Sequence, residues 1–377
     1  MIRDHLRKGS PRATVGPRLA LLLGAVSAVL TAGCVGTSCP PVAAKAGVRQ
    51  ARFAPLRQTA ATAKRRIGTA LMSRHLENAR LRSLVAAHFD SLTAENEMKW
   101  GATEPQPASF SFAAGDELVA FAAQNGMRMR GHTLVWHQQL ADWAKDLPAD
   151  ELRPAMRRHI EALVGRWRGR IAQWDVVNEA ITEDGKLRDS PFLRLGETYL
   201  DEAFRLAHAA DPEARLFYND CGIEAGEGNT KSDAVYRLCA RMRQAGVPIH
   251  GIGMQMHVDP RHWPTAEQIR KNVERFAALG LLVEFTEMDI AVGEMPGSLP
   301  EKLQRQRAIA HDIVAACLHV DKCTGITLWG ASDADSWLCT ERWARLRGRG
   351  PHYPLAFDAD LDPKPMYFGI LDALAGR

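Results

Sequence analysis

Paired Cys-x-x-Cys motifs are missing from this chain of 377 residues, and so is the His-Glu-x-x-His motif of zinc peptidases. Both absences argue against the common zinc sites. Beyond residue 33 no run of 18 apolar residues occurs, which is about the shortest that a membrane-spanning helix needs. What remains is a globular composition, 46% hydrophobic and 24% charged, which excludes wholesale disorder, collagen and coiled coil.

A large excess of one charge is also missing. The formal net charge is only +4. It arises in the first 33 residues, which contain Arg3, Arg7, Lys8, Arg12 and Arg18 but only one acidic residue, Asp4. The rest of the chain is balanced, so its composition gives no reason to expect nucleic acid as a partner.

The amino-terminal segment is typical of an export leader. Its basic start precedes an uncharged run over residues 19–33, which has the length of a signal-peptide core. Small residues before Cys34 resemble a lipoprotein processing site, with ordinary cleavage nearby as the alternative. We therefore expect residues 1–33 to be a signal peptide and Cys34 to be a candidate for lipidation. The protein would then be extracellular or periplasmic. Residues 34–63 are predicted to be a flexible tether, and residues 64–377 a single domain.

Eight short apolar runs alternate with helical patterns through that domain. The predicted strands span residues 67–71, 91–94, 127–130, 171–177, 214–218, 251–256, 281–285 and 325–329. One of the intervening helices places Val235, Leu238, Cys239 and Met242 on a single apolar face. Eight such units predict an α/β fold, the closed (β/α)8 TIM barrel. An open doubly wound sheet is the alternative, but it usually carries a Gly-rich phosphate loop, and Gly68-Thr69-Ala70 is no such loop.

Polar and aromatic side chains follow nearly every predicted strand at its carboxyl end, the end where barrels of this kind place their sites. They are Glu95, Asn96, Lys99, His132, Trp136, Asn178, Glu179, Gln255, His257, Glu287, Asp289, Trp329 and Trp337. Any one of them could be a buried residue whose hydrogen bonds are made within the core. Together at one mouth of the barrel they indicate a functional site.

Two of these residues, Glu179 and Glu287, follow strands on opposite sides of the rim. Cleavage of a glycosidic bond needs two carboxyl groups, one to donate a proton and one to act as nucleophile or base. Indole rings suit the CH faces of sugars, and amides, Lys and His suit their hydroxyls. The pattern therefore favours glycoside hydrolysis. Alternatives are a non-catalytic sugar-binding barrel, or a metal hydrolase built on His132, His137, His257 and Glu287.

The same residues form motifs that resemble glycoside hydrolase family 10 endo-β-1,4-xylanases over about residues 65–375. The motifs are Glu95-Asn96-Glu97-Met98-Lys99-Trp100, Gly131-His132-Thr133-Leu134-Val135-Trp136-His137, Trp174-Asp175-Val176-Val177-Asn178-Glu179-Ala180, Thr286-Glu287-Met288-Asp289-Ile290, and Trp329-Gly330 with Asp333 and Ser336-Trp337. The resemblance implies a (β/α)8 barrel that retains anomeric configuration, acts on xylan and needs no cofactor or metal. We expect a monomer. A β-1,4-glucanase on the same barrel is the nearest alternative.

The resemblance also implies a role for each residue. Glu179 matches the general acid/base and Glu287 the nucleophile, while His257 and Asp289 match the pair that orients and ionises the nucleophile. Sugar contacts are implied for Glu95, Asn96, Lys99, His132, Trp136, Asn178, Gln255, Trp329 and Trp337.

Cysteines and one loop complete the sequence-based predictions. Cys317 and Cys323 flank a predicted helix-to-strand turn and are the best candidates for a disulfide, which the resemblance also implies. For Cys39, Cys221, Cys239 and Cys339 the sequence gives no pairing. Cys221-Gly222 stands where the family often has an aromatic residue on the leaving-group side. The loop over residues 341–350 is rich in arginine and is either a solvated surface or a contact for acidic side groups.

Overall fold

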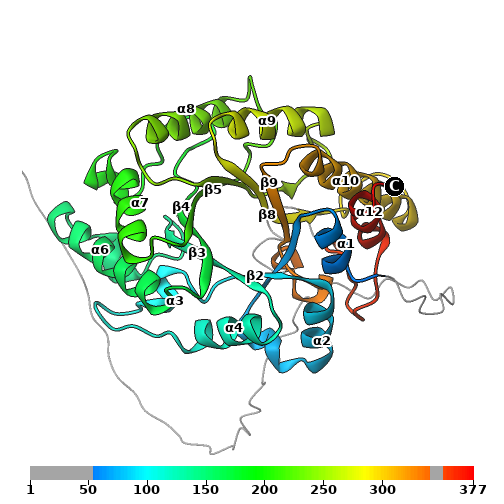
Figure 1. The fold of residues 1–377 in the computed structure, drawn as a ribbon, viewed down its shortest axis with the longest axis horizontal. Helices are drawn as coiled ribbons and strands as arrows, with labels where there is room; N and C mark the ends of the chain where they lie inside the picture. The colour runs from blue at the N-terminus through cyan, green and yellow to red at the C-terminus, as the bar shows by residue number, and fades with distance from the viewer. Residues whose placement is uncertain (1–53, 340–350) are drawn as a thin grey trace, which may run out of the picture. The chain divides into compact units, whose positions relative to one another are not determined.

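The computed structural model describes residues 54–339 and 351–377 (Figure 1). The signal peptide, Cys34, Cys39 and the Arg-rich loop lie outside these residues, and the predictions about them stay predictions. No helix in the described part is long and apolar enough to cross a membrane.

A closed ring of parallel strands forms the centre of the domain (Figure 1). Its strands are β1 (Arg66–Leu71), β2 (Ser91–Ala94), β3 (Arg128–Val135), β4 (Ile171–Asn178), β5 (Arg215–Asp220), β6 (Gly251–Met254), β8 (Leu282–Ile290) and β9 (Cys323–Leu328). Each pairs with the next, β6 pairs with β8, and β9 returns to β1. This closure confirms the predicted barrel and excludes the open sheet. A short extra strand, β7 (His257–Val258), pairs with the end of β8.

Helices surround the ring and cover its outer face (Figure 1). They are α1 (Leu56–Thr62), α2 (Ala79–His88), α3 (Trp100–Thr103), α4 (Ala113–Gln124), α5 (Asp142–Lys145), α6 (Ala149–Arg166), α7 (Tyr199–Ala210), α8 (Thr230–Gln244), α9 (Ala266–Ala278), α10 (Leu299–Leu318) and α12 (Pro365–Leu374), with short 3-10 turns η1 (Ser73–Glu77), η2 (Pro191–Leu195), η3 (Asp333–Asp335) and η4 (Trp337–Cys339). Helix α8 buries the predicted stripe at Val235, Cys239 and Met242, as an amphipathic helix should.

The predicted tether is wrong at its carboxyl end, because residues 56–62 form helix α1. The helix buries Leu56 and Ala60, and the Arg57 guanidinium donates to the carbonyl oxygens of Ala86 at 2.8 Å and Asn125 at 3.2 Å. The sequence of this helix contains few apolar residues and so shows no clear helical periodicity. Its packing against the barrel stabilises it instead. The folded domain therefore includes residues 56–62, which the prediction assigned to the tether.

The disulfide between Cys317 and Cys323 is present and confirms that prediction. It joins the last turns of α10 to the first residue of β9. Cys221 and Cys239 are free thiols.

Candidate active site

The sequence-predicted residues gather at the carboxyl ends of the strands. Asn178 ends β4 and Glu179 follows it, while Glu287 and Asp289 lie near the end of β8. His257 opens β7. Hydrogen bonds and ring contacts join the residues of this group to one another. One polar site therefore occupies this mouth of the barrel.

Glu287 is buried and receives hydrogen bonds on both carboxylate oxygens. Asn219 Nδ2 donates to Oε1 at 2.7 Å, and His257 Nε2 lies 3.2 Å from Oε2. Burial alone would raise the pKa of Glu287, but the charge of His132 and the hydrogen bond from His257 outweigh it and lower that pKa below its ordinary value. Glu287 is therefore held as the carboxylate, the form that a nucleophile requires.

His257 lies between two carboxylates. Its Nδ1 is 2.9 Å from Asp289 Oδ2, and that same oxygen accepts a hydrogen bond of 2.6 Å from Trp337 Nε1. Burial would lower the pKa of His257, yet Asp289 and Glu287 raise it to about 10. The imidazolium consequently stays charged through the neutral range and presents a fixed proton donor to Glu287.

Glu179 leaves β4 with a left-handed backbone, at φ of 54°. Such a conformation costs a non-glycine residue on the order of 1 kcal/mol or more. Backbone bonds hold it in place, since Glu179 N donates to the Asn219 carbonyl at 2.9 Å and Arg188 Nε donates to the Glu179 carbonyl at 2.8 Å. The turn directs the carboxylate to Trp136 Nε1 at 3.1 Å and Gln255 Nε2 at 3.1 Å.

Amide side chains connect the two glutamates. Because the Glu287 carboxylate can only accept, Asn219 presents its NH2 group there, and the same group donates to Asn178 Oδ1 at 2.8 Å. Gln255 Nε2 donates both to Asn178 Oδ1 at 3.2 Å and to Glu179. Asn178 then turns its own NH2 toward Glu179 Oε1, 3.4 Å away. The two carboxyl groups therefore belong to one hydrogen-bonded network.

A glycine makes room for this network. A Cβ atom on Gly253 of β6 would lie 2.1 Å from Asn219 Oδ1 and 2.8 Å from the Thr286 methyl carbon. Thr286 Oγ1 donates to that same Asn219 oxygen at 2.6 Å. Any larger residue at position 253 would displace the amide that bonds to Glu287.

A lysine lies beside both glutamates on the β2 side of the site. Lys99 Nζ donates to Asn96 Oδ1 at 3.1 Å and lies 4.8 Å from the centre of a Trp136 ring. Its burial lowers the pKa of Lys99, opposed mainly by the charges of Glu287 and Glu95. Burial also raises the pKa of Glu95 to about 7, although Lys99 counteracts it. Glu95 and Lys99 are buried, and the corner is rich in hydrogen-bonding groups.

Indole and imidazole rings line the rest of the mouth. Trp329 contacts the His132 and His257 rings edge-on, with centroids 5.3 and 6.2 Å apart. His132 Nδ1 lies 3.0 Å from Asp175 Oδ2. Trp337 packs on His257 at 4.8 Å. The predicted substrate contacts thus form a continuous wall around Glu287.

Cys221 stands where the family resemblance led us to expect an aromatic residue. Its Sγ lies 3.8 Å from Lys231 Nζ, and Lys231 bonds to Glu183 Oε1 at 2.8 Å and Asp220 Oδ1 at 3.1 Å. Burial and the nearby Glu179 raise the pKa of Cys221 well above its ordinary value. The group is a neutral thiol and offers no ring for a sugar to stack on.

Sequence reasoning missed the role of Asn219. The motifs assign no function to Asn219, whereas the structure makes it the direct partner of Glu287. Its position at a strand end, next to two other polar strand ends, was the available signal. Asp175 and Arg130 were also missed. Arg130 Nε bonds to Asp175 Oδ2 at 3.0 Å beneath His132 and fixes that side of the site.

The metal-hydrolase alternative finds no support in this geometry. Both nitrogens of His257 face carboxylates within a hydrogen-bonded chain, and His132 bonds to Asp175. Among the residues that the structure describes, no group of three or more His, Cys, Asp or Glu side chains is placed to hold a metal ion.

The chain is similar to known proteins in sequence and in fold. A beta-1,4-xylanase of Dictyoglomus thermophilum is 38% identical over 310 residues, which cover 79% of this chain and 85% of that protein. Endo-1,4-beta-xylanase B of Thermotoga neapolitana is 39% identical and covers 76% of this chain and 81% of its own length. The crystal structure of xylanase 10B from Thermotoga petrophila RKU-1 in complex with xylobiose superposes with a TM-score of 0.80, at 35% identity, over 86% of this chain and 98% of that one. The sequence model of Glycosyl hydrolase family 10 matches residues 55–373, and the chain belongs to that family.

Proposed function

We propose that this protein is a retaining endo-β-1,4-xylanase that cuts internal bonds of xylan. Glu287 attacks the anomeric carbon while Glu179 protonates the leaving oxygen, which gives a covalent glycosyl-enzyme ester. Glu179, now ionised, then activates a water that releases the sugar. The route needs no cofactor, because the two carboxyl groups supply the proton and the nucleophile.

The observation that carries the proposal is the different environment of two carboxyl groups in one network. Glu287 bonds to a cationic imidazole and an amide, so it is ionised and fixed. Glu179 bonds to an indole and an amide, which are neutral donors. A double displacement needs one carboxylate that stays ionised and one carboxyl group that exchanges a proton during each turnover.

Two features support xylan over other β-1,4-linked polymers. The relatives and solved neighbours of this chain are named as xylanases, one of them in complex with xylobiose. Glu95 and Lys99 are buried beside Asn96, and we expect this crowded corner to accept xylose more readily than glucose, which carries an additional hydroxymethyl group.

Product analysis tests the proposal. Purified enzyme should release short xylo-oligosaccharides from xylan and little or nothing from cellulose. Proton NMR of the first products should show the β-anomer before mutarotation. Release of the α-anomer, faster cleavage of cellulose, or binding of xylan without cleavage would each contradict it.

We also propose that the protein is exported and that Cys34 carries the anchoring lipid. Support comes from the basic start, the uncharged run over residues 19–33 and the small residues before Cys34. Mass spectrometry of the mature amino terminus would detect a diacylglyceryl cysteine. An unmodified amino terminus at another residue near Cys34 would contradict the lipid but would agree with export by ordinary cleavage. A mature protein that still begins at Met1 would contradict both export and the lipid.

A further inference from the structure

The mouth of the barrel opposite the active site is lined by basic side chains. Strands β1, β3 and β5 begin with Arg66, Arg128 and Arg215. A hollow of about 360 Å³ lies among these residues, and Lys64 and Arg65 before β1 also line it. The hollow is at the amino ends of the strands, whereas the carboxyl groups of the active site are at the carboxyl ends.

Strand alternation directs two of these arginines to the barrel axis. Arg130, two residues after Arg128, bonds across the interior to Glu284 of β8 at 2.9 Å. Phe217, two residues after Arg215, lies under the Arg130 guanidinium at 4.7 Å. Side chains two residues apart share one face of a strand, so Arg128 and Arg215 point to the same axis and reach the hollow from different strands.

The carboxylates of the hollow already have partners. Asp90 accepts from Arg66 Nη1 and from the Ile67 backbone, both at 2.9 Å. Glu284 accepts from Arg130 Nη1 at 2.9 Å and Thr324 Oγ1 at 2.8 Å. Both acidic side chains that line the hollow are therefore already bonded. The partner of Glu284, Arg130, lies outside the hollow.

Three of the other cations that line the hollow have no such partners. Among the residues that the structure describes, the side chains of Lys64, Arg128 and Arg215 form no hydrogen bond and no ion pair within 4.0 Å. Arg65 differs from these three, because its Nη2 donates to the carbonyl oxygens of Leu318 and Val320 and lies 4.0 Å from Asp321, although its Nε has no partner among the described residues. Partial burial and the charges of Arg66 and Arg215 lower the pKa of Arg128. Since an arginine stays protonated in any case, the repulsion is not relieved by loss of a proton.

We propose that this hollow binds a small multivalent oxyanion of the phosphate or sulfate type. Guanidinium groups donate in a fork that matches such oxygens two at a time, and here the forks come from separate strands around one concave space. The anion would supply the negative charge that Asp90 and Glu284 do not. The hollow is concave and bounded by strand ends, which favours a free anion over the headgroup of a lipid surface.

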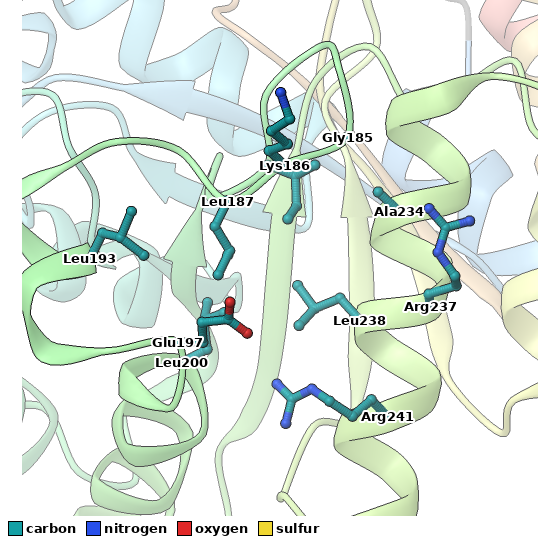
Figure 2. Close-up of a pocket in the computed structure, with 11 residues that line it drawn as sticks. Gly185, Lys186, Leu187, Leu193, Glu197, Leu200, Ala234, Arg237, Leu238 and Arg241 are labelled. Atoms are coloured by element: carbon teal, nitrogen blue, oxygen red, sulfur yellow. The ribbon is translucent and has the colours of Figure 1, made fainter.

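A second hollow lacks these properties (Figure 2). It measures about 500 Å³ and lies between α7, α8 and the loop over residues 181–187. Leu187, Leu193 and Leu238 supply much of its wall. Its Arg241 is already paired in two bonds to Asp201. Of its three cations, Lys186 is paired with Asp184 and Arg241 with Asp201. Only Arg237 is left, so the hollow offers no comparable cluster of cations.

Isothermal titration calorimetry of the full chain with inorganic sulfate, and separately with inorganic phosphate, tests the proposal at constant ionic strength in chloride. We expect saturable binding at one site for either anion. Arg128→Gln and Arg215→Gln should each weaken it about tenfold, the value of one charge-assisted hydrogen bond pair. Arg237→Gln, an exposed arginine on α8, is the matched control and should leave the affinity unchanged.

Two further measurements keep the result interpretable. Both barrel-mouth variants should keep the wild-type melting temperature in chloride or exceed it, because a repelling charge is removed, but should lose the rise in melting temperature that sulfate gives the wild type. Xylan hydrolysis should stay within about twofold of the wild type, which shows an intact fold. Equal anion affinity in all four proteins would overturn the proposal. So would binding to phosphatidylglycerol vesicles without binding to free sulfate or phosphate, since a lipid surface would then be the ligand.

Discussion

The two carboxyl groups of the active site lie in one network but have different kinds of partner. Glu287 bonds to His257, a cation whose own charge is fixed by Asp289. Glu179 bonds to Trp136 and Gln255, which carry no charge. A cationic donor stabilises the ionised form of a carboxyl group more strongly than a neutral donor does. The comparison teaches that two identical side chains take different roles because their hydrogen-bonding partners differ. Changing the partners of one glutamate at a time tests this.

The largest effect should follow Glu287→Ala. The variant lacks the attacking oxygen, so xylan turnover should fall by several orders of magnitude while the circular dichroism spectrum stays unchanged. Azide should restore cleavage of an activated aryl xylobioside and give the α-glycosyl azide, because the small anion enters the space of the missing carboxylate. Turnover near the wild-type rate would refute the assignment of the nucleophile.

Glu179→Ala should separate substrates by their leaving group. Turnover of xylan should fall by about 10²–10⁴-fold, the usual contribution of general acid–base catalysis. An aryl xylobioside with an acidic phenol needs no protonation, so its kcat/KM should stay close to the wild-type value while kcat falls. Azide should then give the β-glycosyl azide, because the ester on Glu287 still forms. An equal loss on both substrates would count against the acid role.

His257→Asn removes the charge from the nucleophile side. We expect kcat to fall by about 10–100-fold, the range for losing a hydrogen bond from a charged group. Activity needs the Glu287 carboxylate, and the variant raises the pKa of Glu287 because a lowering partner is gone. The acidic limb of the kcat/KM profile should therefore move to higher pH. His319→Asn, at the end of α10, is the control. An unmoved acidic limb in His257→Asn would mean that the imidazole only fills space.

Asn219→Ala should have a smaller effect than the change at His257, because the lost donor is neutral. We expect kcat to fall about tenfold, with KM changed little. Thr286→Val removes only the hydroxyl that fixes Asn219, so its loss should be smaller still. If Thr286→Val proved the more damaging of the two, the network would act through packing and not through the bond to Glu287.

Much of the fold could be predicted from the sequence because hydrophobic runs mark the strands. All eight predicted runs overlap strands of the ring. The apolar runs predict the end of a strand too early where polar residues continue it. Strands β3 and β8 extend through Thr133 and Asp289, well beyond their predicted ends. Both side chains are buried. Thr133 Oγ1 donates to the Asp175 carbonyl oxygen of β4, and Asp289 Oδ2 lies 2.9 Å from His257 Nδ1. These contacts join separate strands, so they leave no local pattern in the sequence.

The site was predictable in its members but not in its connections. Motifs identify Glu179 and Glu287, yet nothing local shows that Asn219 bonds to one of them or that Glu179 takes a left-handed backbone. Both features arise only when β4, β5 and β8 come together. Sequence therefore names the reacting groups, and tertiary contacts decide which of them is held ionised.

The smallest effect on catalysis should come from the far end of the barrel. Cys317→Ser with Cys323→Ser opens the loop that the disulfide closes at the start of β9. In the chain-entropy account, a closure over six positions contributes about 2 kcal/mol to the free energy of unfolding. Denaturant titration should show that loss, and kcat on xylan at 25 °C should stay unchanged, because no bond of the network passes through α10. A fall in kcat without a fall in stability would mean that the strand ends at the two mouths of the barrel are coupled, and the differences between Glu179 and Glu287 could then no longer be assigned to their immediate partners alone.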